Sequence, residues 1–349
     1  MGGPGWEPPG APERSERQQR FHRTIDWVDG AVVIVDQTRL PGEVVYLRLE
    51  SVEALVDAIQ RLAVRGAPAL GVAGALGVAL AAARHSDADE RAHAVHLLET
   101  ARPTAVNLAR GARRVAAVLP SFDAALAEAL RVRDEEIVSS AEMARRGADL
   151  VEKLCGGDVR LLTHCNTGGL AAVVDGTALA VVFELHRRGA LRGVIASETR
   201  PLLQGARLTT WELRRAGVPH RLAVDSAGPF LMARGEVDAV ILGADRICAN
   251  GDVVNKIGTY AHALGARAAG IPFICVAPES TVDLATATGA DVEIEDRGAA
   301  EITGATAPSG TAAVNPAFDV TPAALVTAVV TDARVFSGRA DGADGPAVG

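Results

Sequence analysis

The stretch AVILGADRICANGDVVNKIGTY, residues 239–260, decides the fold. Its first residues form an apolar run that predicts a buried strand. An acid, Asp245, follows that strand, and after a Gly- and Asn-rich turn we expect a helix to open around Asn255 and Lys256. Ligands of open parallel α/β sheets bind outside the carboxyl ends of the strands. This order of residues therefore favours an anion site that also holds a proton-transfer group.

A purely structural reading of the same stretch stands beside this one. A lone aspartate after a strand commonly stabilises a turn, and a lysine is commonly a solvated surface charge. The other strands decide between the two readings, because a shared site requires chemically competent residues at several neighbouring strand ends.

From residue 159 onward, apolar runs alternate with helical patterns, which is typical of βαβ units around a parallel sheet. No GxGxxG motif follows any of these runs, so a dinucleotide cofactor is not indicated. The runs are VRLLTHC (159–165), GVIASE (193–198), HRLAVD (220–225), AVILGAD (239–245) and PFICVAP (272–278). The helical patterns cover Leu170–Arg188, Gln204–Ala216, Ala227–Arg234 and Asn255–Ala269.

The preceding part of the chain is predicted to be mainly helical after a small antiparallel sheet between residues 21 and 49. Ser51 is expected to cap a helix that stops before the sequence Arg-Gly-Ala-Pro, where a helix rich in small residues begins. The fold class is thus α/β. We predict disordered tails at 1–19 and 338–349, an N-terminal domain at 20–140 and a C-terminal domain at 141–337.

Composition excludes several classes of function. The formal net charge of −8 argues against general nucleic-acid binding, which needs a basic face. The four cysteines lack the CxxC spacing of metal sites. The N-terminus has no apolar core of a signal peptide, and the Ala-rich run near Ala69–Ala83 is judged too short and too Gly-rich to span a membrane. We therefore expect a cytoplasmic protein without membrane or nucleic-acid partners.

Polar residues gather where the predicted strands end, which favours one shared crevice. Cys165 follows the first strand and precedes Asn-Thr-Gly-Gly, so we expect its thiol near backbone amides and a helix N-terminus. A free cysteine is more often a small buried hydrophobe, which is the reading we favour for the other three. His164 points to the opposite face of the strand, so a dyad with Cys165 is not expected. The remaining ends are Glu198-Thr199-Arg200, Asp225-Ser226 and Pro278-Glu279-Ser280.

Arg65-Gly66-Ala67-Pro68 is the best phosphate candidate in the N-terminal part, because a guanidinium and helix-start amides together bind anions. A simple interhelical turn with an exposed arginine is an equal alternative. Arg102-Pro103-Thr104 is a similar, weaker candidate.

Six motifs together resemble the methylthioribose-1-phosphate isomerases. The wider fold is shared with ribose-1,5-bisphosphate isomerases and with regulatory subunits of a eukaryotic translation-initiation exchange factor. The motifs are RGAPALG (65–71), ARPTAVN (101–107), THCNTGGLA (163–171), ETRPLLQGARLTTWEL (198–213), GADRICANGDVVNKIGTY (243–260) and NPAFDVTPAAL (315–325).

The resemblance implies an N-terminal, mainly helical domain with a small sheet, a C-terminal Rossmann-like domain, a homodimer, and no organic cofactor or metal. It implies conversion of S-methyl-5-thio-α-D-ribose 1-phosphate into S-methyl-5-thio-D-ribulose 1-phosphate in methionine salvage. It makes Cys165 and Asp245 the catalytic pair. The implied substrate-binding residues are Arg65, Gly66, Ala67, Arg102, Gln204, Asn255 and Lys256.

The chain departs from the family pattern at Leu76, where a tyrosine is expected, and this leaves the sugar's 5-substituent open. Alternatives are an isomerase of 5-deoxyribose 1-phosphate or ribose 1,5-bisphosphate, and a non-catalytic regulatory subunit of the same fold. An acid that works near neutral pH must keep its proton, so we expect Asp245 to be buried.

Overall fold

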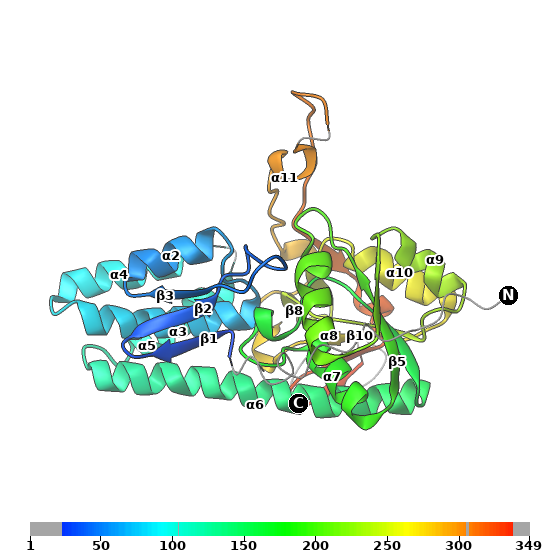
Figure 1. Cartoon of the computed structure of the whole chain (residues 1–349), viewed down its shortest axis with the longest axis horizontal. Helices are drawn as coiled ribbons and strands as arrows, with labels where there is room; N and C mark the ends of the chain where they lie inside the picture. The colour runs from blue at the N-terminus through cyan, green and yellow to red at the C-terminus, as the bar shows by residue number, and fades with distance from the viewer. Residues whose placement is uncertain (1–22, 104, 305–306, 338–349) are drawn as a thin grey trace. The chain divides into compact units, whose positions relative to one another are not determined.

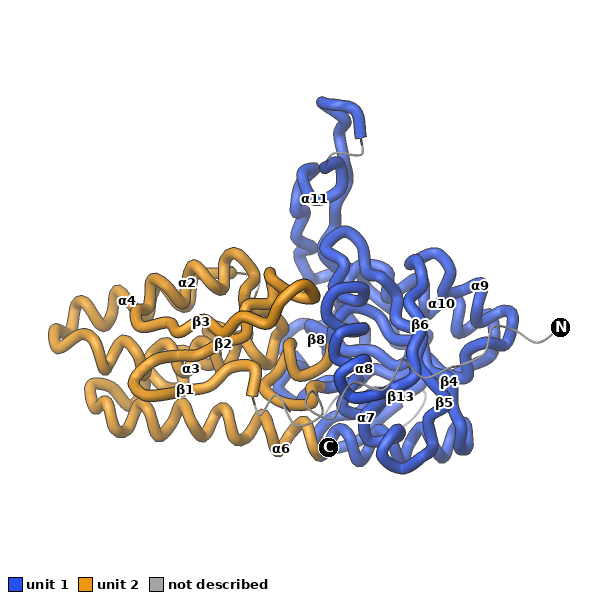
Figure 2. Tube along the Cα trace, viewed as in Figure 1, with its two compact units in different colours: residues 1–18, 142–166, 177–349 blue, residues 19–141, 167–176 orange. Residues whose placement is uncertain are grey.

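The computed structural model describes residues 23–103, 105–304 and 307–337, which form two compact units (Figure 1). Figure 2 colours unit 1 blue and unit 2 orange. Within the described residues, unit 1 contains 142–166 and 177–337, and unit 2 contains 23–141 and 167–176. The tails predicted to be disordered lie outside the described residues.

Unit 2 combines a three-stranded sheet with helices, as its sequence predicts. The antiparallel sheet has the order β1-β2-β3, and its apolar face packs against the helices in one hydrophobic core. The elements are β1 (Ile25–Val28), β2 (Ala31–Val35), β3 (Tyr46–Leu49), α2 (Val52–Gln60), α3 (Ala67–Arg84), α4 (Ala88–Thr100), α5 (Val106–Ala116) and the first part of α6 (Phe122–Cys155).

Local signals place the first two of these helices. The Ser51 hydroxyl accepts a hydrogen bond from the Ala54 amide at 3.2 Å, which is the predicted N-cap of α2. Helix α3 has Pro68 in its first turn, where the missing amide hydrogen costs nothing.

Helix α3 corrects one sequence argument. It extends over 18 residues and, by length and composition alone, is apolar enough to cross a membrane. However, 67% of it is buried, and its side chains belong to the core of unit 2. Such burial is what a core helix needs, so α3 is weak evidence for a membrane span.

Unit 1 is built on a seven-stranded sheet with the order β14-β13-β10-β7-β4-β5-β6. All neighbouring strands are parallel except β13 and β14. The strands are β4 (Val159–Thr163), β5 (Leu191–Ser197), β6 (His220–Ala223), β7 (Ala239–Leu242), β10 (Phe273–Val276), β13 (Ala328–Val330) and β14 (Val335–Phe336). The predicted fold class, α/β with a helical N-terminal part and a parallel C-terminal sheet, is confirmed.

Both faces of this sheet are covered by helices. Successive side chains of a strand point to opposite sides, so neighbouring residues belong to different cores. Leu161 and Ile241 belong to one core together with the end of α6 and with α7, whereas Leu162 and Val240 belong to a second core with α10. The α-helices of unit 1 beyond the end of α6 are α7 (Ala178–Arg188), α8 (Thr210–Ala216), α9 (Ala227–Ala233), α10 (Thr259–Ala269) and α11 (Ala300–Thr303). Shorter helices are the π-helix η2 (Gly205–Thr209) and the 3₁₀ helices η3 (Glu279–Thr281), η4 (Gly289–Asp291) and η5 (Ala323–Leu325).

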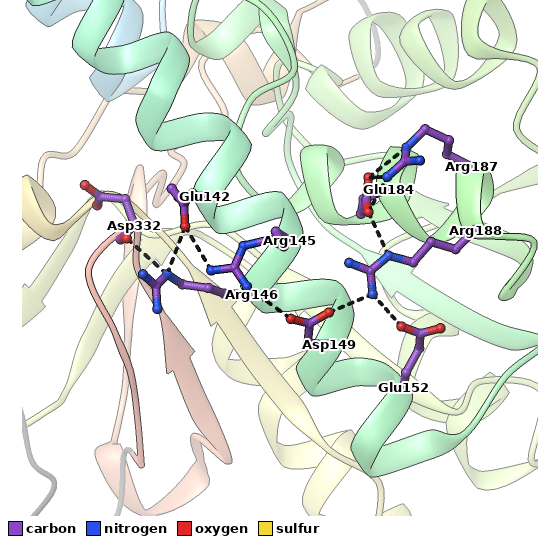
Figure 3. Close-up of polar contacts among 9 residues, drawn as sticks. All are labelled: Glu142, Arg145, Arg146, Asp149, Glu152, Glu184, Arg187, Arg188 and Asp332. Carbon is purple, nitrogen blue, oxygen red and sulfur yellow. Dashed lines mark hydrogen bonds and ion pairs between the residues drawn. The ribbon is translucent and has the colours of Figure 1, made fainter.

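Ion pairs join the end of α6 to α7 along the outside of unit 1 (Figure 3). The Arg188 guanidinium contacts the carboxylates of Asp149 and Glu152 at 2.7 and 2.6 Å, and that of Glu184 within its own helix. Most of these side chains are partly exposed, so each pair contributes little to stability.

A second sheet in unit 1, with the order β11-β8-β9-β12, was not predicted. Asn255 and Lys256 lie on β9, and α10 begins only at Thr259. The prediction that a helix begins at these two residues is therefore wrong. The strands are β8 (Arg246–Cys248), β9 (Val253–Lys256), β11 (Val282–Asp283) and β12 (Phe318–Thr321).

The helix predicted over Leu170–Arg188 is also partly wrong. Only α7 is an α-helix, and the segment before it contains a short 3₁₀ helix, η1 (Gly169–Ala171), and belongs to unit 2. Gly176 has a φ of +90°, a conformation that interrupts a helix. Among the described residues of this segment, the helix that follows Cys165 is therefore only the three-residue 3₁₀ helix η1, and the α-helix expected there begins later, at Ala178.

Candidate active site

The strand order of unit 1 identifies where a ligand is expected. From β4 the chain proceeds through β5 to β6 in one direction, and from β7 through β10 to β13 in the other. Strands β4 and β7 are parallel neighbours, so the order reverses between them. In such sheets the ligand binds beyond the carboxyl ends of the strands at this switch point. Cys165 follows β4 and Asp245 follows β7, so both predicted catalytic residues lie at the switch point.

Cys165 is half-buried, and its backbone is held in an uncommon conformation. Its φ is +64°, the left-handed region that costs a non-glycine residue of order 1–3 kcal/mol. Two threonine hydroxyls bind its backbone: its amide donates to Thr199 Oγ1 at 2.9 Å, and its carbonyl accepts from Thr209 Oγ1 at 2.6 Å. These bonds offset part of the strain.

The loop that carries Thr199 is itself strained and anchored. Thr199 has a φ of +66°, and Leu203, whose amide donates to the Thr199 carbonyl at 2.8 Å, has a φ of +57°. Asp225, at the end of β6, accepts from the amides of Thr199 and Arg200 at 2.8 and 2.7 Å and from the Ser197 hydroxyl. Burial alone would raise the pKa of Asp225, but these hydrogen bonds lower it overall. Asp225 is therefore an ionised anchor for the loop after β5.

Asp245 does not have the environment that the sequence reading expected. Its side chain is exposed rather than buried, so that expectation is wrong for this structure. Its amide donates to the Val254 carbonyl at 2.9 Å, which ties the end of β7 to β9.

Gln204 is buried and lies where the helical stretch after β5 begins. Its side-chain oxygen has no hydrogen-bond partner within the described residues, which makes it a ready acceptor for a ligand hydroxyl. Gly205, next to it, packs against the end of β5: a Cβ there would come within 1.7 Å of the Ser197 carbonyl oxygen. Only glycine fits this close approach.

The other two predicted binding residues of unit 1 have partners on neighbouring elements. Asn255 is buried, and its side chain donates to Thr259 Oγ1 at 2.9 Å. The Lys256 ammonium donates to the Ala317 carbonyl at 2.8 Å and lies 4.5 Å from the centre of the Phe318 ring. Both therefore come from a strand rather than a helix start, and the anion-binding argument from a helix start does not apply to them.

The remaining predicted binding residues belong to unit 2. Arg65 and Arg102 are half-buried in the connections before α3 and α5. Ala67 is the first residue of α3, as predicted, and Gly66 caps it with a φ of +94°. A Cβ at Gly66 would come within 2.4 Å of the Ala171 carbonyl oxygen, so this position also requires glycine.

His164 is not the base of a cysteine dyad. It is fully buried, and its Nε2 lies 2.8 Å from the Ile257 carbonyl oxygen, so Nε2 carries the hydrogen and donates. Its ring packs edge-on against His262 of α10 at a centroid distance of 5.0 Å. Burial lowers the pKa of both imidazoles, that of His262 to about 3, with a further contribution from His164.

This buried pair predicts a pH dependence of stability. Below the ordinary histidine pKa of about 6.5, these two histidines bind protons in the unfolded chain but stay neutral in the folded chain. The free energy of unfolding is therefore highest above that pH and decreases on acidification. Between about pH 7.5 and about pH 5.5 we expect His262, whose pKa falls to about 3, to contribute a loss of about 1.4 kcal/mol in the free energy of unfolding, and His164 to contribute a further loss in the same direction. Urea denaturation at several pH values measures it.

The change His262→Leu should remove the part of that pH dependence that His262 contributes, whatever it does to stability at neutral pH. His93→Gln, at an exposed position of α4, is the control and should leave the slope unchanged. An unaltered slope in His262→Leu would rule out this account of the pair.

The described residues contain no group of three or more His, Cys, Asp or Glu side chains that could hold a metal ion. All four cysteines are free, and Cys248 and Cys275 are buried. Among the described residues, the predicted site residues of unit 1 therefore supply a thiol (Cys165), a carboxylate (Asp245), two side-chain amides (Gln204 and Asn255) and an ammonium group (Lys256).

Comparison with known proteins decides the family. The model of the initiation factor 2 subunit family matches residues 63–337. The chain belongs to this family. The resemblance read from the motifs is confirmed.

Family members with curated names include several isomerases. A probable bifunctional methylthioribose-1-phosphate isomerase/methylthioribulose-1-phosphate dehydratase of Nocardia farcinica is 54% identical over 90% of this chain, which spans only 59% of that relative. A methylthioribose-1-phosphate isomerase of Anaeromyxobacter sp. is 51% identical, over 87% of this chain and 90% of the relative. A 5-deoxyribose 1-phosphate isomerase of Moorella thermoacetica is 48% identical, over 89% and 93%.

Solved structures of the family agree on the fold. The 5-methylthioribose 1-phosphate isomerase of Pyrococcus horikoshii OT3 superposes with a TM-score of 0.85 at 38% identity, over 93% of this chain and 94% of that one. A structure described as the translation initiation factor eIF-2B, subunit delta, from A. fulgidus has a TM-score of 0.81 at 43% identity, over 90% and 96%.

Two residues that hold the site were seen in the sequence but given no role there. Thr199 and Asp225 stand among the polar residues at strand ends, and only the structure shows that they bind the backbone around Cys165. Thr209 was missed, because a threonine within a helical pattern gives no sequence signal of its own.

Proposed function

We propose that the protein is an aldose–ketose isomerase that converts S-methyl-5-thio-α-D-ribose 1-phosphate into S-methyl-5-thio-D-ribulose 1-phosphate in methionine salvage. The observation that carries the proposal is the position of Cys165 and Asp245 at the switch point of the parallel sheet. The relatives named as isomerases of this sugar phosphate support it.

The substrate explains why both a carboxylic acid and a thiol are useful. A sugar phosphorylated at its anomeric oxygen cannot open to an aldehyde spontaneously, so the ring must open with the phosphate attached. We assign Asp245 to protonate the ring oxygen as its bond to C1 breaks. A positioned acid of this kind contributes about 10²–10⁴ in rate. Because Asp245 is exposed here, we expect bound substrate to bury it.

Hydrogen then moves from C2 to C1. In one route the Cys165 thiolate removes the C2 proton, which gives an enediolate-like intermediate. The thiol then returns a proton to C1, and the C2 hydroxyl gives its proton to the Asp245 carboxylate as C2 becomes the ketone, which restores both groups. In the other route hydride shifts directly from C2 to C1, and Cys165 only shapes the pocket. Deuterium from D₂O at C1 of the product would indicate the first route, and its absence would favour the second.

We assign substrate binding to the set implied by the motifs. The buried side-chain oxygen of Gln204, which has no hydrogen-bond partner in the described part of the chain, suits a sugar hydroxyl, since a buried acceptor without a partner is costly until a ligand satisfies it. The ammonium of Lys256 and the guanidinium groups of Arg65 and Arg102 supply positive charge for the phosphate. Gly66 and Ala67 offer backbone amides at the start of α3, and Asn255 offers an amide side chain.

The closest alternative keeps the chemistry and changes the sugar. The Moorella thermoacetica relative is named for 5-deoxyribose 1-phosphate, so an isomerase of that sugar is the second candidate, and one of ribose 1,5-bisphosphate is the third. A non-catalytic regulatory subunit is disfavoured, because such a subunit needs neither the thiol of Cys165 nor the acid of Asp245. We also propose a cytoplasmic homodimer that needs no metal or organic cofactor.

The test of catalysis is direct. Purified protein in buffer with a metal chelator is incubated with methylthioribose 1-phosphate, and the ketose carbon of the product is followed by ¹³C NMR. We expect ketose to accumulate, and to do so no faster with added metal. If no ketose forms at any protein concentration, the non-catalytic reading replaces the proposal.

A further inference from the structure

Cys165 is fixed at the switch point by groups outside the predicted site. A cysteine in a loop normally satisfies its backbone through a turn or through water. Here both of its backbone polar groups bind side-chain hydroxyls, those of Thr199 and Thr209. With a φ of +64°, its conformation is uncommon for a side chain with a Cβ, so surrounding bonds must hold it there.

Thr199 is fully buried, and each of its polar groups has a defined task. Its hydroxyl donates to the Ser197 carbonyl at 3.1 Å and accepts from the Cys165 amide. Its own φ is +66°, rare for a β-branched residue. The Asp225 carboxylate holds this backbone through the Thr199 amide on one side and the Arg200 amide on the other. A single line of hydrogen bonds therefore runs from Asp225 through Thr199 to Cys165.

Strain is also concentrated here. Among the described residues, six non-glycine residues have a positive φ, and three of them, Cys165, Thr199 and Leu203, are joined by direct hydrogen bonds. Strained backbone persists where surrounding structure over-determines it, and it clusters at functional sites. The strained residues and the hydrogen bonds that stabilise them all surround the backbone of Cys165, which carries the thiol.

We propose that Asp225 and Thr199 are positioning residues for Cys165: the carboxylate fixes the Thr199 backbone, and the Thr199 hydroxyl fixes the Cys165 amide and so aims the thiol. This inference rests on the catalytic role of Cys165 in the proposed function. Neither residue needs to touch substrate. Displacing a reacting group by about 1 Å can lower its rate by about 10²-fold.

The structure offers a matched pair of variants for the test. Thr199→Val removes the hydroxyl but keeps the shape and the β-branch, whereas Thr199→Ser keeps the hydroxyl. Turnover, KM and thermal unfolding are measured for both. Alkylation of Cys165 by iodoacetamide is followed by peptide mass spectrometry, with Cys155, which is also half-buried, as the internal reference.

For Thr199→Val we expect kcat to fall by at least about 10-fold while KM stays within about 3-fold, because the thiol is misplaced and the binding groups are not. The alkylation rate of Cys165 should change relative to Cys155. Thr199→Ser should restore most of kcat and the original alkylation ratio. If Thr199→Val does not fold, Asp225→Asn, which removes the acceptor for the Arg200 amide, should show the same pattern.

Wild-type kcat together with an unchanged alkylation ratio in Thr199→Val would overturn the proposal. A loss of kcat that merely follows the loss of folded protein, with no change at Cys165, would overturn it too. The alkylation measurement needs no substrate. If the wild-type protein isomerises none of the sugars, an altered ratio still supports the positioning of Cys165 while the proposed function fails.

Discussion

Cys165→Ser and Asp245→Asn should each lower turnover of methylthioribose 1-phosphate by at least about 10²-fold, with KM within about 3-fold of the wild-type value. Serine is far less acidic than cysteine and cannot serve as the thiolate in hydrogen transfer. Asparagine keeps the size of aspartate but carries no transferable proton. Both changes remove an interaction that matters only in the transition state, so they should spare substrate binding. Steady-state kinetics with the ketose product as readout measures this.

Two control variants show whether replacing any cysteine or aspartate lowers turnover, or only these two. Cys155→Ser alters a half-buried thiol whose sulfur contacts the Asp238 carbonyl oxygen at 3.8 Å. Asp89→Asn alters an exposed carboxylate in the first turn of α4. Both should leave turnover within about 2-fold of wild type, because neither residue follows the carboxyl end of a strand at the switch point. Near-normal turnover in Cys165→Ser and Asp245→Asn would end the assignment of the catalytic pair.

Gly205→Ala should have the largest effect on folding among the glycines next to the site. Its Cβ would lie 1.7 Å from the Ser197 carbonyl oxygen and 2.9 Å from Thr199 Oγ1, distances that no relaxation of a side-chain tip can relieve. The end of β5 or the helix after it must shift, and overpacking of this kind costs about 1–3 kcal/mol or more. Because the shift displaces the loop that holds Cys165, activity should fall with stability. Thermal unfolding and kcat are measured together.

Gly157→Ala is the matched control. Nothing lies within 4 Å of a Cβ at that position, and its φ is not in the left-handed region. We expect a change within about 0.5 kcal/mol. Wild-type stability in Gly205→Ala would mean that the close packing at the end of β5 is not as the structure has it.

Much of the fold can be predicted from local patterns. The apolar runs of β4 and β7 are predicted as buried strands, because a parallel strand that is covered on both faces needs a nearly continuous apolar sequence. In the structure both strands are buried on both faces. Ser51 and Pro68 fix helix starts through bonds within a few residues. The order of strands does not follow from these patterns. It is the order that brings Cys165 and Asp245 to one edge.

The errors arise where distant contacts decide the structure. The pattern around Asn255 and Lys256 fits a helix by itself, but these residues pair with Asp319 and Phe318 of β12. That pairing depends on a segment far along the chain, which local periodicity does not report. The bonds that make Thr199 and Asp225 important likewise join the ends of three separate strands. Their position after a predicted strand makes these polar residues candidates from the sequence. Their hydrogen bonds around Cys165 are visible only in the assembled sheet.

The sugar's 5-substituent is the least predictable feature. Leu76, the departure from the family pattern that first raised the question, is fully buried in the core of unit 2. Its side chain therefore contributes to the packing of α3 and gives no information about substrate preference.

The measurement that tests the central claim most directly compares initial rates on three sugars under identical conditions. The sugars are methylthioribose 1-phosphate, 5-deoxyribose 1-phosphate and ribose 1,5-bisphosphate, each followed by NMR of the ketose product. We predict the highest kcat/KM for the methylthio sugar, by at least about 10-fold, because losing the apolar methylthio group forfeits about 1–3 kcal/mol of binding. A higher kcat/KM for either other sugar would contradict the proposed substrate, and no ketose from any of the three would contradict catalysis itself.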